Sequence, residues 1–119
     1  MEEKRILVLD TETTGLSFDD DKLIEIGIVE LKDDILTQNN FHEYINPKKD
    51  IGLSAQKVHG ISNEFLVNKP TFNEIAKKFL DFVKGDVLII HNAEFDLNFI
   101  NKELQNCGFN NLQNPVIDT

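Results

Sequence analysis

Two short acidic motifs each follow directly on an apolar run, and this arrangement constrains the fold more than any other feature of the sequence. Ile6–Leu9 precedes the motif DTETTG (residues 10–15), and Val87–Ile90 precedes HNAEFD (residues 91–96). Four consecutive β-branched or leucine residues predict a central strand that is buried on both faces. Carboxylates at the ends of such strands stay ionised only if a cation compensates them. The pattern therefore predicts a sheet with acidic groups gathered where its central strands end.

The remaining pattern predicts a mixed α/β domain with the element order β-β-β-α-β-α-β. Strands expected at 5–10, 23–31 and 41–45 are joined by connections too short for helical crossovers, so they should form an antiparallel meander. Three helices are expected later in the chain. The first is a short helix at 54–59 capped by Ser54, the second begins at the capping box Thr71–Glu74 and is ended by Gly85, and the third extends from the cap Asn92 to Gly108. A strand at 87–90 should lie parallel to the first strand, and a last strand begins at Pro115.

Composition and charge set limits on function. The formal net charge of −9 argues against a module that grips nucleic acid through a basic face, but it is compatible with an enzyme whose metal ions hold one or two phosphates. We interpret Asp19–Asp21 as a solvated loop, and the single Cys107 as a small buried helix residue in a reducing cytosol. Glu2 and Glu3 stand where a signal peptide would have its basic start, and no apolar stretch in the sequence approaches membrane-spanning length. The sequence therefore predicts one soluble, cytoplasmic domain with no membrane partner.

Three carboxylates are candidates for one site. Asp10 and Glu12 are two residues apart in a strand and point to the same face, and Asp96 lies in the first turn of the helix after the fourth expected strand. Oxygen-only ligands suit Mg²⁺ or Mn²⁺, and two such ions can clamp the attacking and leaving oxygens in phosphodiester hydrolysis. Any one of these residues alone is more often a helix cap or dipole partner, but together they favour a site.

Longer motifs point to a family. DTETTGL, IEIGIVEL, VHGI, KPTF and IIHNAEFD, with their spacing, resemble the DEDD superfamily of 3′–5′ exonucleases, and within it the proofreading epsilon subunits of bacterial DNA polymerase III. The likeness extends from about Ile6 to Thr119. It implies a ribonuclease H-like fold, a mixed sheet flanked by helices, and removal of mispaired nucleotides as 5′-monophosphates from a DNA 3′ end. By the same likeness, the partners are a single-stranded or frayed DNA 3′ end, the polymerase catalytic alpha subunit and, secondarily, the theta subunit.

The resemblance also implies roles for particular residues. Asp10 would bridge two divalent cations, Mg²⁺ or Mn²⁺, while Glu12 would ligate one and Asp96 would act directly or through water. The terminal nucleotide would lie along the backbone of Thr11–Gly15. The residues that match the family's apolar wedge and pocket positions are Leu16, Phe95, Val58 and His59. By its position alone, His59 reads as a helix-terminal histidine bonded to a carbonyl. Ser54 stands where close relatives often place an acidic residue near the 3′ hydroxyl.

The family's third motif, which supplies a general base and a fourth carboxylate, has no counterpart in these 119 residues. His91 and Asp96 imitate its spacing, but they belong to the second motif, so we assign no general base. His42 should be structural, and Asp118 a helix cap. The chain therefore matches the N-terminal part of one exonuclease domain, and we expect the 119 residues alone to have little or no nuclease activity.

Two other functions stay open. One is a DEDD exonuclease that trims RNA 3′ ends, and the other is a non-catalytic module that docks on a polymerase. Retention of Asp10, Glu12 and Asp96 speaks against the second, because a scaffold has no reason to hold three carboxylates together.

Overall fold

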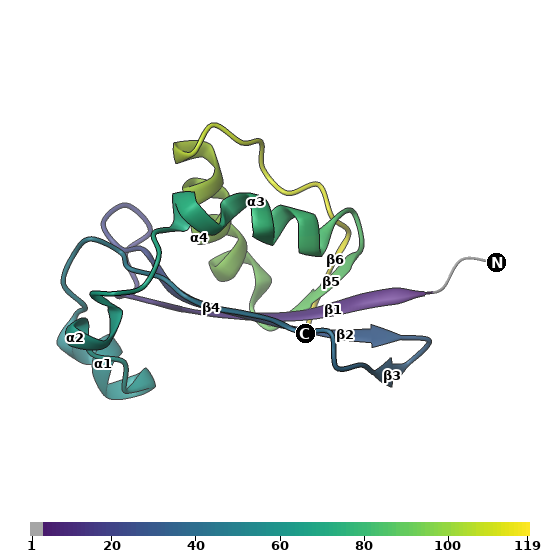
Figure 1. The fold of residues 1–119 in the computed structure, drawn as a ribbon, viewed down its shortest axis with the longest axis horizontal. Coiled ribbons are helices and arrows are strands. Elements are labelled where there is room, and N and C mark those ends of the chain that lie inside the picture. The colour runs from purple at the N-terminus through teal and green to yellow at the C-terminus, as the bar shows by residue number, and fades with distance from the viewer. Residues whose placement is uncertain (1–3) are drawn as a thin grey trace.

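One mixed sheet of six strands forms the centre of the fold in the computed structural model, which describes residues 4–119. The strands lie in the order β3-β2-β1-β5-β6, and β4 also pairs with β2 (Figure 1). β1 is antiparallel to β2, β2 is antiparallel to β4, and β5 lies parallel to both β1 and β6, as the sequence predicts. The bounds are β1 Arg5–Thr13, β2 Leu23–Lys32, β3 Ile35–Leu36, β4 Phe41–Tyr44, β5 Val87–Ile90 and β6 Val116–Asp118.

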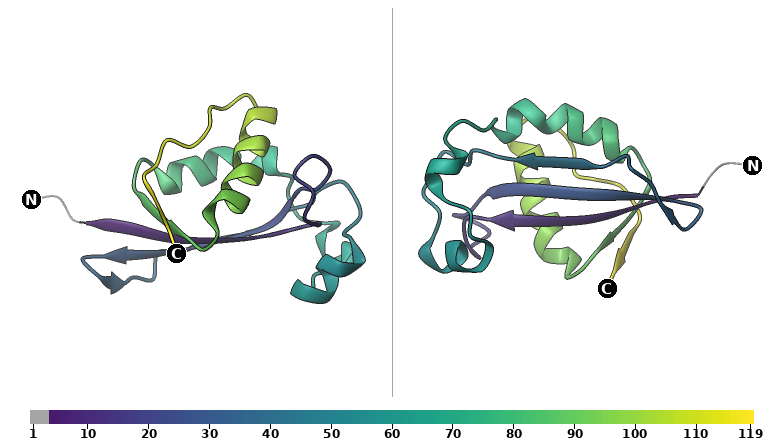
Figure 2. Two further views of the ribbon diagram at one scale, coloured as in Figure 1. Left: turned by 180° about the vertical axis from the view of Figure 1, so that it is seen from behind. Right: turned by 60° about the horizontal axis from the view of Figure 1, so that its bottom comes forward.

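Two longer helices cover one face of this sheet, and two short ones lie beyond the C-terminal end of β1 (Figures 1 and 2). The long helices are α3 (Phe72–Val83) and α4 (Ala93–Asn106), and the short ones are α1 (Leu53–His59) and α2 (Asn63–Leu66). Within residues 4–119, none of the helices is long and apolar enough to cross a bilayer.

The central strands are buried on one face only, so the expectation of burial on both faces is wrong. In β1, Leu7 and Leu9 are almost fully buried beneath the helices, whereas Val8 between them is 36% exposed. β5 shows the same alternation, with Leu88 and Ile90 buried and their neighbours partly exposed. The reason is that α3 and α4 lie on the same side of the sheet, which leaves its other face open over the described residues (Figure 2).

Local sequence signals account for most helix boundaries. The backbone N–H and the hydroxyl of Thr71 both bind the Glu74 carboxylate, which confirms the predicted capping box of α3. Gly85 follows the C-cap residue Lys84 of α3, as predicted, although the positive φ of 49° falls on Lys84, whose N–H bonds back into the helix. Gly108, with a φ of +86°, follows the C-cap of α4 as predicted.

The apolar side chains form two clusters. The larger lies between the sheet and α3 and α4, and Cys107 packs against it half-buried rather than fully buried. The smaller consists of Ile24, Ile51 and Leu66, beneath α1 and α2. The end of the sheet where the acidic motifs lie is therefore bordered by both clusters.

Candidate active site

β1 places Asp10 and Glu12 on the open face of the sheet. The strand runs to Thr13 rather than ending at residue 10, so both acids lie inside it and share a face. Their neighbours on β2 are Gly27 and Glu25, and the side chain of Asp10 is exposed while that of Glu12 is half-buried. Glu12 and Glu25 thus form a second pair of carboxylates, across the two strands. The sequence pattern does not predict this pair.

Asp96 approaches from the first turn of α4. It is only 5% exposed, and its Oδ1 accepts a short hydrogen bond from the hydroxyl of Thr11, which points to the helical side of β1. Burial raises the pKa of Asp96 to about 6; the negative charges of Asp10 and Glu12 push the pKa in the same direction, and the Thr11 hydroxyl and His91 oppose them.

The pKa of Glu12 is raised by similar causes. Its pKa is raised first by burial, then by the charges of Asp10 and Glu25, with His59 acting against them. The negative charge of Asp10 therefore disfavours ionisation of both Glu12 and Asp96, and that of Glu12 disfavours ionisation of Asp96.

This donor set fits a divalent cation. A cation near the three carboxylates would offset the repulsion, and oxygen donors without thiolate suit Mg²⁺ or Mn²⁺. In the part of the chain that the structure describes, no three His, Cys, Asp or Glu side chains converge closely enough to enclose an ion as they stand. Asp10, Glu12 and Asp96 would hold the ion after side-chain adjustment, and it would supply activation of water and charge stabilisation at phosphate.

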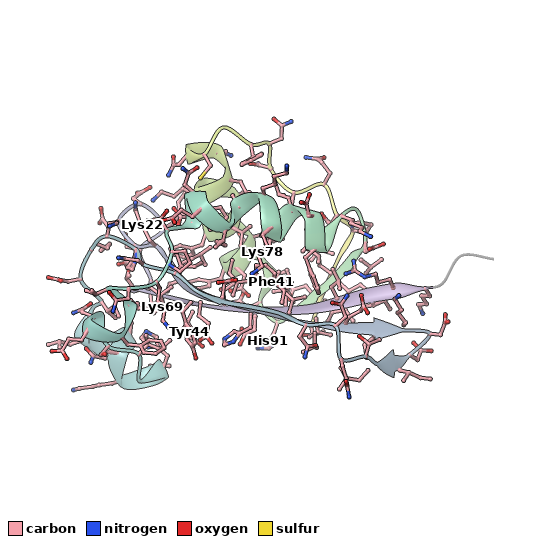
Figure 3. The ribbon with its side chains drawn as sticks, in the orientation of Figure 1. Lys22, Phe41, Tyr44, Lys69, Lys78 and His91 are labelled. Carbon is pink, nitrogen blue, oxygen red and sulfur yellow. The ribbon has the colours of Figure 1, made fainter. Side chains whose placement is uncertain are left out.

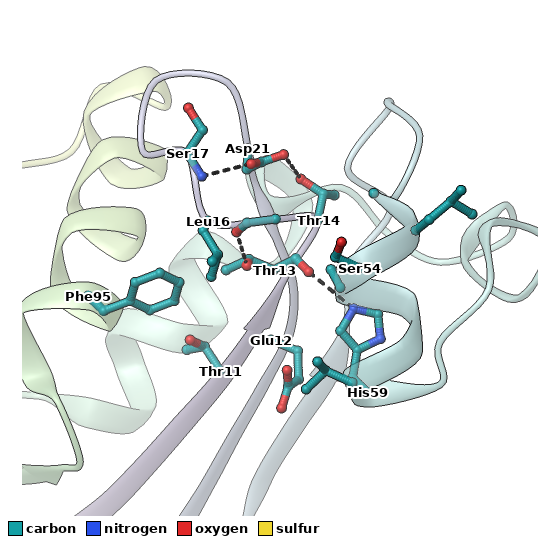
Figure 4. A pocket seen from close by; sticks show the side chains of 15 residues that line it. Thr11, Glu12, Thr13, Thr14, Leu16, Ser17, Asp21, Ser54, His59 and Phe95 are labelled. Carbon is teal, nitrogen blue, oxygen red and sulfur yellow. Dashed lines mark hydrogen bonds between the residues drawn. The ribbon is translucent and has the colours of Figure 1, made fainter.

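A cavity of about 680 Å³ adjoins Glu12 at the end of β1. Its volume suits a nucleotide-sized ligand. Figure 4 shows Phe95 entering it from α4 and His59 from α1, with the end of β1 between them. Of the predicted site residues, those that line this cavity are Thr11, Glu12, Gly15, Leu16, Val58, His59 and Phe95, whereas Asp10 and Asp96 do not.

His59 ties α1 to β1. The backbone N–H of Ile61 donates to His59 Nδ1 at 3.0 Å, so the ring proton is on Nε2, which donates to the carbonyl oxygen of Thr13 at 3.2 Å. Both ring nitrogens are therefore used by the backbone, as the helix-terminal interpretation predicts. His59 shapes the cavity and is not free to accept a proton from water.

The other two histidines have separate surroundings. His42 Nε2 binds a carboxylate oxygen of Glu25 at 2.6 Å, in keeping with a structural role. His91 is exposed at the end of β5, and its Nδ1 lies 3.5 Å from the hydroxyl of Thr119. Figure 3 places Tyr44 and His91 on the side of the sheet away from α3. Asp118 is an exposed β6 residue opposite Ile90.

Two loop assignments need correction. Ser54 is not the cap of α1, because the helix begins at Leu53 with Gly52 in the cap position; Ser54 instead lines the cavity. Asp21 is not merely solvated, since its carboxylate accepts hydrogen bonds from Thr14 and Lys49 and from the Ser17 backbone. No spacing rule singles out Asp21 within a run of three aspartates.

Comparisons with known proteins agree with this geometry. Residues 7–119 match the model of the RNase_T family, which is described as exonuclease. The chain belongs to this exonuclease family. It is 50% identical over 110 residues to the DNA polymerase III subunit epsilon of Buchnera aphidicola (subsp. Acyrthosiphon pisum), covering 88% of this chain and 46% of the relative. For the same subunit of Escherichia coli K12 the identity is 48% over 104 residues, covering 83% and 43%.

The resemblance to DEDD exonucleases near the epsilon subunits is thereby confirmed, and the chain spans about half the length of the curated relatives it matches. Solved structures confirm the ribonuclease H-like fold. Exonuclease I in complex with the inhibitor BCBP superposes with a TM-score of 0.89 at 14% identity, covering 99% of this chain and 29% of that one. Exonuclease X in complex with 5′ overhanging duplex DNA gives a TM-score of 0.70 at 22% identity, covering 95% and 58%.

Proposed function

We propose that these residues are the N-terminal part of a 3′–5′ exodeoxyribonuclease domain that proofreads during DNA replication. The domain removes mispaired nucleotides as 5′-monophosphates by phosphodiester hydrolysis that depends on two divalent cations, Mg²⁺ or Mn²⁺. The observation that carries the proposal is the 680 Å³ cavity beside Glu12, next to carboxylates that repel one another. Such a site accommodates one nucleotide and places its phosphate near a cation position.

The family resemblance supplies the proposed roles, and the positions of the side chains around the cavity support them. Asp10, Glu12 and Asp96 hold the cations. Leu16, Val58 and Phe95 present apolar surface to the terminal base, and the backbone of residues 11–15 runs along the nucleotide. The Thr11 hydroxyl orients the carboxylate of Asp96 through its hydrogen bond. Ser54 replaces an acidic contact to the 3′ hydroxyl with a neutral one.

A general base is the group that the described residues do not provide. His59 has both ring nitrogens bonded to backbone and His42 is bonded to Glu25, while His91 belongs to the second motif. We propose that a longer protein supplies the base and a fourth carboxylate, and that the 119 residues alone have little activity, because general-base catalysis is worth about 10²–10⁴-fold.

The partners are inferred from relatives. Curated relatives are DNA polymerase III epsilon subunits, and we propose docking on the polymerase alpha subunit and the theta subunit in the bacterial cytoplasm. The substrate is the 3′ end of single-stranded or frayed DNA. With a net charge of −9, affinity for this DNA comes from the cations and from the polymerase that delivers the strand, rather than from a basic face.

An RNA-trimming exonuclease is the competing enzymatic function, and a non-catalytic docking module is the competing function of another class. Comparing the rates at which DNA and RNA oligonucleotides are degraded distinguishes the RNA-trimming exonuclease from the proposed function. A docking module would keep its polymerase partner and show no turnover under any condition.

The test measures mononucleotide release from a 3′-mismatched primer with Mn²⁺ by a longer protein that contains residues 1–119. We expect Asp10→Asn to reduce turnover by about 10²-fold or more, because loss of even a residue that orients a metal ligand costs about 10–100-fold. Glu103→Gln is the control, since Glu103 is a buried carboxylate on α4 outside the cavity. Equal turnover by the wild type and Asp10→Asn, or by the longer protein and the 119-residue chain, contradicts the proposal.

A further inference from the structure

The loop between β1 and β2 crosses from one wall of the cavity to the other. On the α4 side, Lys102 Nζ donates to the carbonyl oxygens of Phe18 and Asp19 at 2.6 and 2.8 Å. The Phe18 ring also packs edge-on against Phe99, with centroids 6.1 Å apart. The middle of the loop, at Phe18 and Asp19, is therefore fixed to α4.

Asp21 fixes the part of the loop that follows β1. Its Oδ1 accepts a hydrogen bond from the Thr14 hydroxyl at 2.8 Å, and its Oδ2 accepts one from the Ser17 N–H at 2.9 Å (Figure 4). Oδ1 also accepts from Lys49 Nζ at 3.1 Å. Lys49 lies on the segment that leads into α1. One carboxylate thus joins the end of β1, the middle of the loop and the approach to the opposite wall.

The same carboxylate packs directly on Gly15. A Cβ atom at Gly15 would lie 2.4 Å from Oδ2 of Asp21, so only glycine permits this approach without displacement. Thr14, which is completely buried, accepts a hydrogen bond from the Gly52 N–H at 2.8 Å through its carbonyl oxygen. The turn at residues 14–16 is therefore held from both sides.

The residue presented by this turn is Leu16, which is 86% exposed and lines the cavity. An exposed leucine has no packing of its own to fix its position, so its place in the cavity depends on the backbone that carries it. Asp21 holds this backbone through its contact with Gly15 and its hydrogen bonds with Thr14 and Ser17.

We propose that Asp21 is a positioning residue for the nucleotide pocket: it fixes the positions of Leu16 and Gly15 relative to the terminal nucleotide. The inference rests on the proposed function of the cavity. Asp21 acts through the turn, whereas Leu16 contacts the base. Burial raises the pKa of Asp21, but the hydrogen bonds from Thr14, Ser17 and Lys49 outweigh it and lower the pKa, so the carboxylate stays charged at neutral pH.

The test substitutes Asp21→Asn in the longer protein. The amide keeps the size of the side chain, but it loses the charge that binds Lys49 and turns one acceptor into a donor. We expect KM for a 3′-mismatched primer to rise about tenfold with kcat within about twofold, because ground-state binding and transition-state binding are weakened equally. We expect the Kd for thymidine 5′-monophosphate with Mn²⁺, measured by calorimetry, to rise by the same factor.

Asp19→Asn is the matched control. It makes the same change of charge two residues away, and in the hydrogen bonds of the described chain Asp19 contributes only its backbone carbonyl. We expect it to leave KM and Kd within about twofold.

A double-mutant cycle with Leu16→Ala identifies the route of the effect. If Asp21 acts through Leu16, the double variant raises KM by clearly less than the product of the two single effects.

The outcomes separate the two claims. A wild type that binds thymidine 5′-monophosphate but releases no nucleotide from DNA or RNA defeats the proposed function, and the binding arm still decides the role of Asp21. The role of Asp21 is overturned if Asp21→Asn matches Asp19→Asn in KM and Kd. It is overturned also if Asp21→Asn lowers kcat at unchanged KM, as for a loss of folded protein, or if the two single effects multiply fully.

Discussion

Replacing Asp96 with asparagine removes a buried negative charge and keeps an oxygen that accepts the Thr11 hydroxyl. Asp96 is 5% exposed and its pKa is raised to about 6 by burial and by the charges of Asp10 and Glu12. Without metal, its ionised form therefore destabilises the fold. We expect Asp96→Asn to increase the free energy of unfolding of the metal-free protein.

The magnitude and its pH dependence follow from linkage. A shift from 3.8 to about 6 corresponds to about 3 kcal/mol at 1.36 kcal/mol per pKa unit, so we expect a gain of about 2–3 kcal/mol. Because the folded pKa is raised, the folded wild type binds more protons than the unfolded chain between 3.8 and about 6. Wild-type stability therefore falls as pH rises through this window, and the gain from Asp96→Asn is full above pH 6, about half near pH 5 and absent below about pH 4.

The assay is urea unfolding in the presence of a chelator at several pH values, repeated with Mn²⁺. In Mn²⁺ the order reverses, because the cation stabilises the wild type by binding the ionised carboxylates and stabilises Asp96→Asn less. Glu103→Gln is the control. Glu103 is also buried on α4 and its pKa is also raised by burial, so Glu103→Gln should be more stable than the wild type in chelator. Unlike Asp96→Asn, it should be stabilised by Mn²⁺ as much as the wild type is.

Two results would refute this reasoning. One is that Asp96→Asn is less stable than the wild type in chelator near pH 8, which would make Asp96 a structural acceptor. The other is a gain that is equal near pH 8 and below pH 4, since an electrostatic cause requires it to vanish when Asp96 is protonated.

Three further substitutions test the surroundings of the site by urea unfolding. Arg5→Met leaves the 2%-exposed Glu30 without its 2.5 Å ion pair and should cost about 3 kcal/mol near neutral pH. Because the Arg5 hydrogen bond lowers the pKa of Glu30, the cost should shrink as pH falls below the usual carboxyl range; a pH-independent cost would contradict this. Thr14→Val removes the hydroxyl that binds Asp21 and accepts from the Lys22 N–H, and should cost about 2 kcal/mol, whereas Thr14→Ser should cost little. Gly15→Ala should cost about 1–2 kcal/mol, and additional replacement of Asp21 by alanine should remove most of that cost if the 2.4 Å approach causes it.

The sequence predicts the elements whose signals are local. The capping box and the helical spacing of α3 lie within residues 71–83, and the apolar runs of β1 and β5 mark two neighbouring parallel strands. The two-residue β3 and the four-residue α2 are too short to leave a periodic pattern.

The site is less predictable because it depends on contacts between distant residues. Asp10 is exposed because the helices cover only the other face of the sheet, which no pattern within β1 records. Asp21 acquires its role from Thr14 and from Lys49, which is 28 residues away. The place of His59 in the cavity likewise depends on a carbonyl 46 residues away. The predicted ligand roles of Asp10, Glu12 and Asp96 remain predictions.

Because the apolar side chains form two separate clusters, the two walls of the cavity differ in local stability. β1 and α4 rest on the large cluster, whereas α1 rests on the small one, which is Ile24, Ile51 and Leu66 with the partly buried Tyr44, Ala55 and Ile61 packed against it. A segment held by so few apolar contacts opens at lower free energy than strands at the centre of a sheet. The wall that carries Val58 and His59 should therefore open at lower free energy than the strand that carries Asp10 and Glu12.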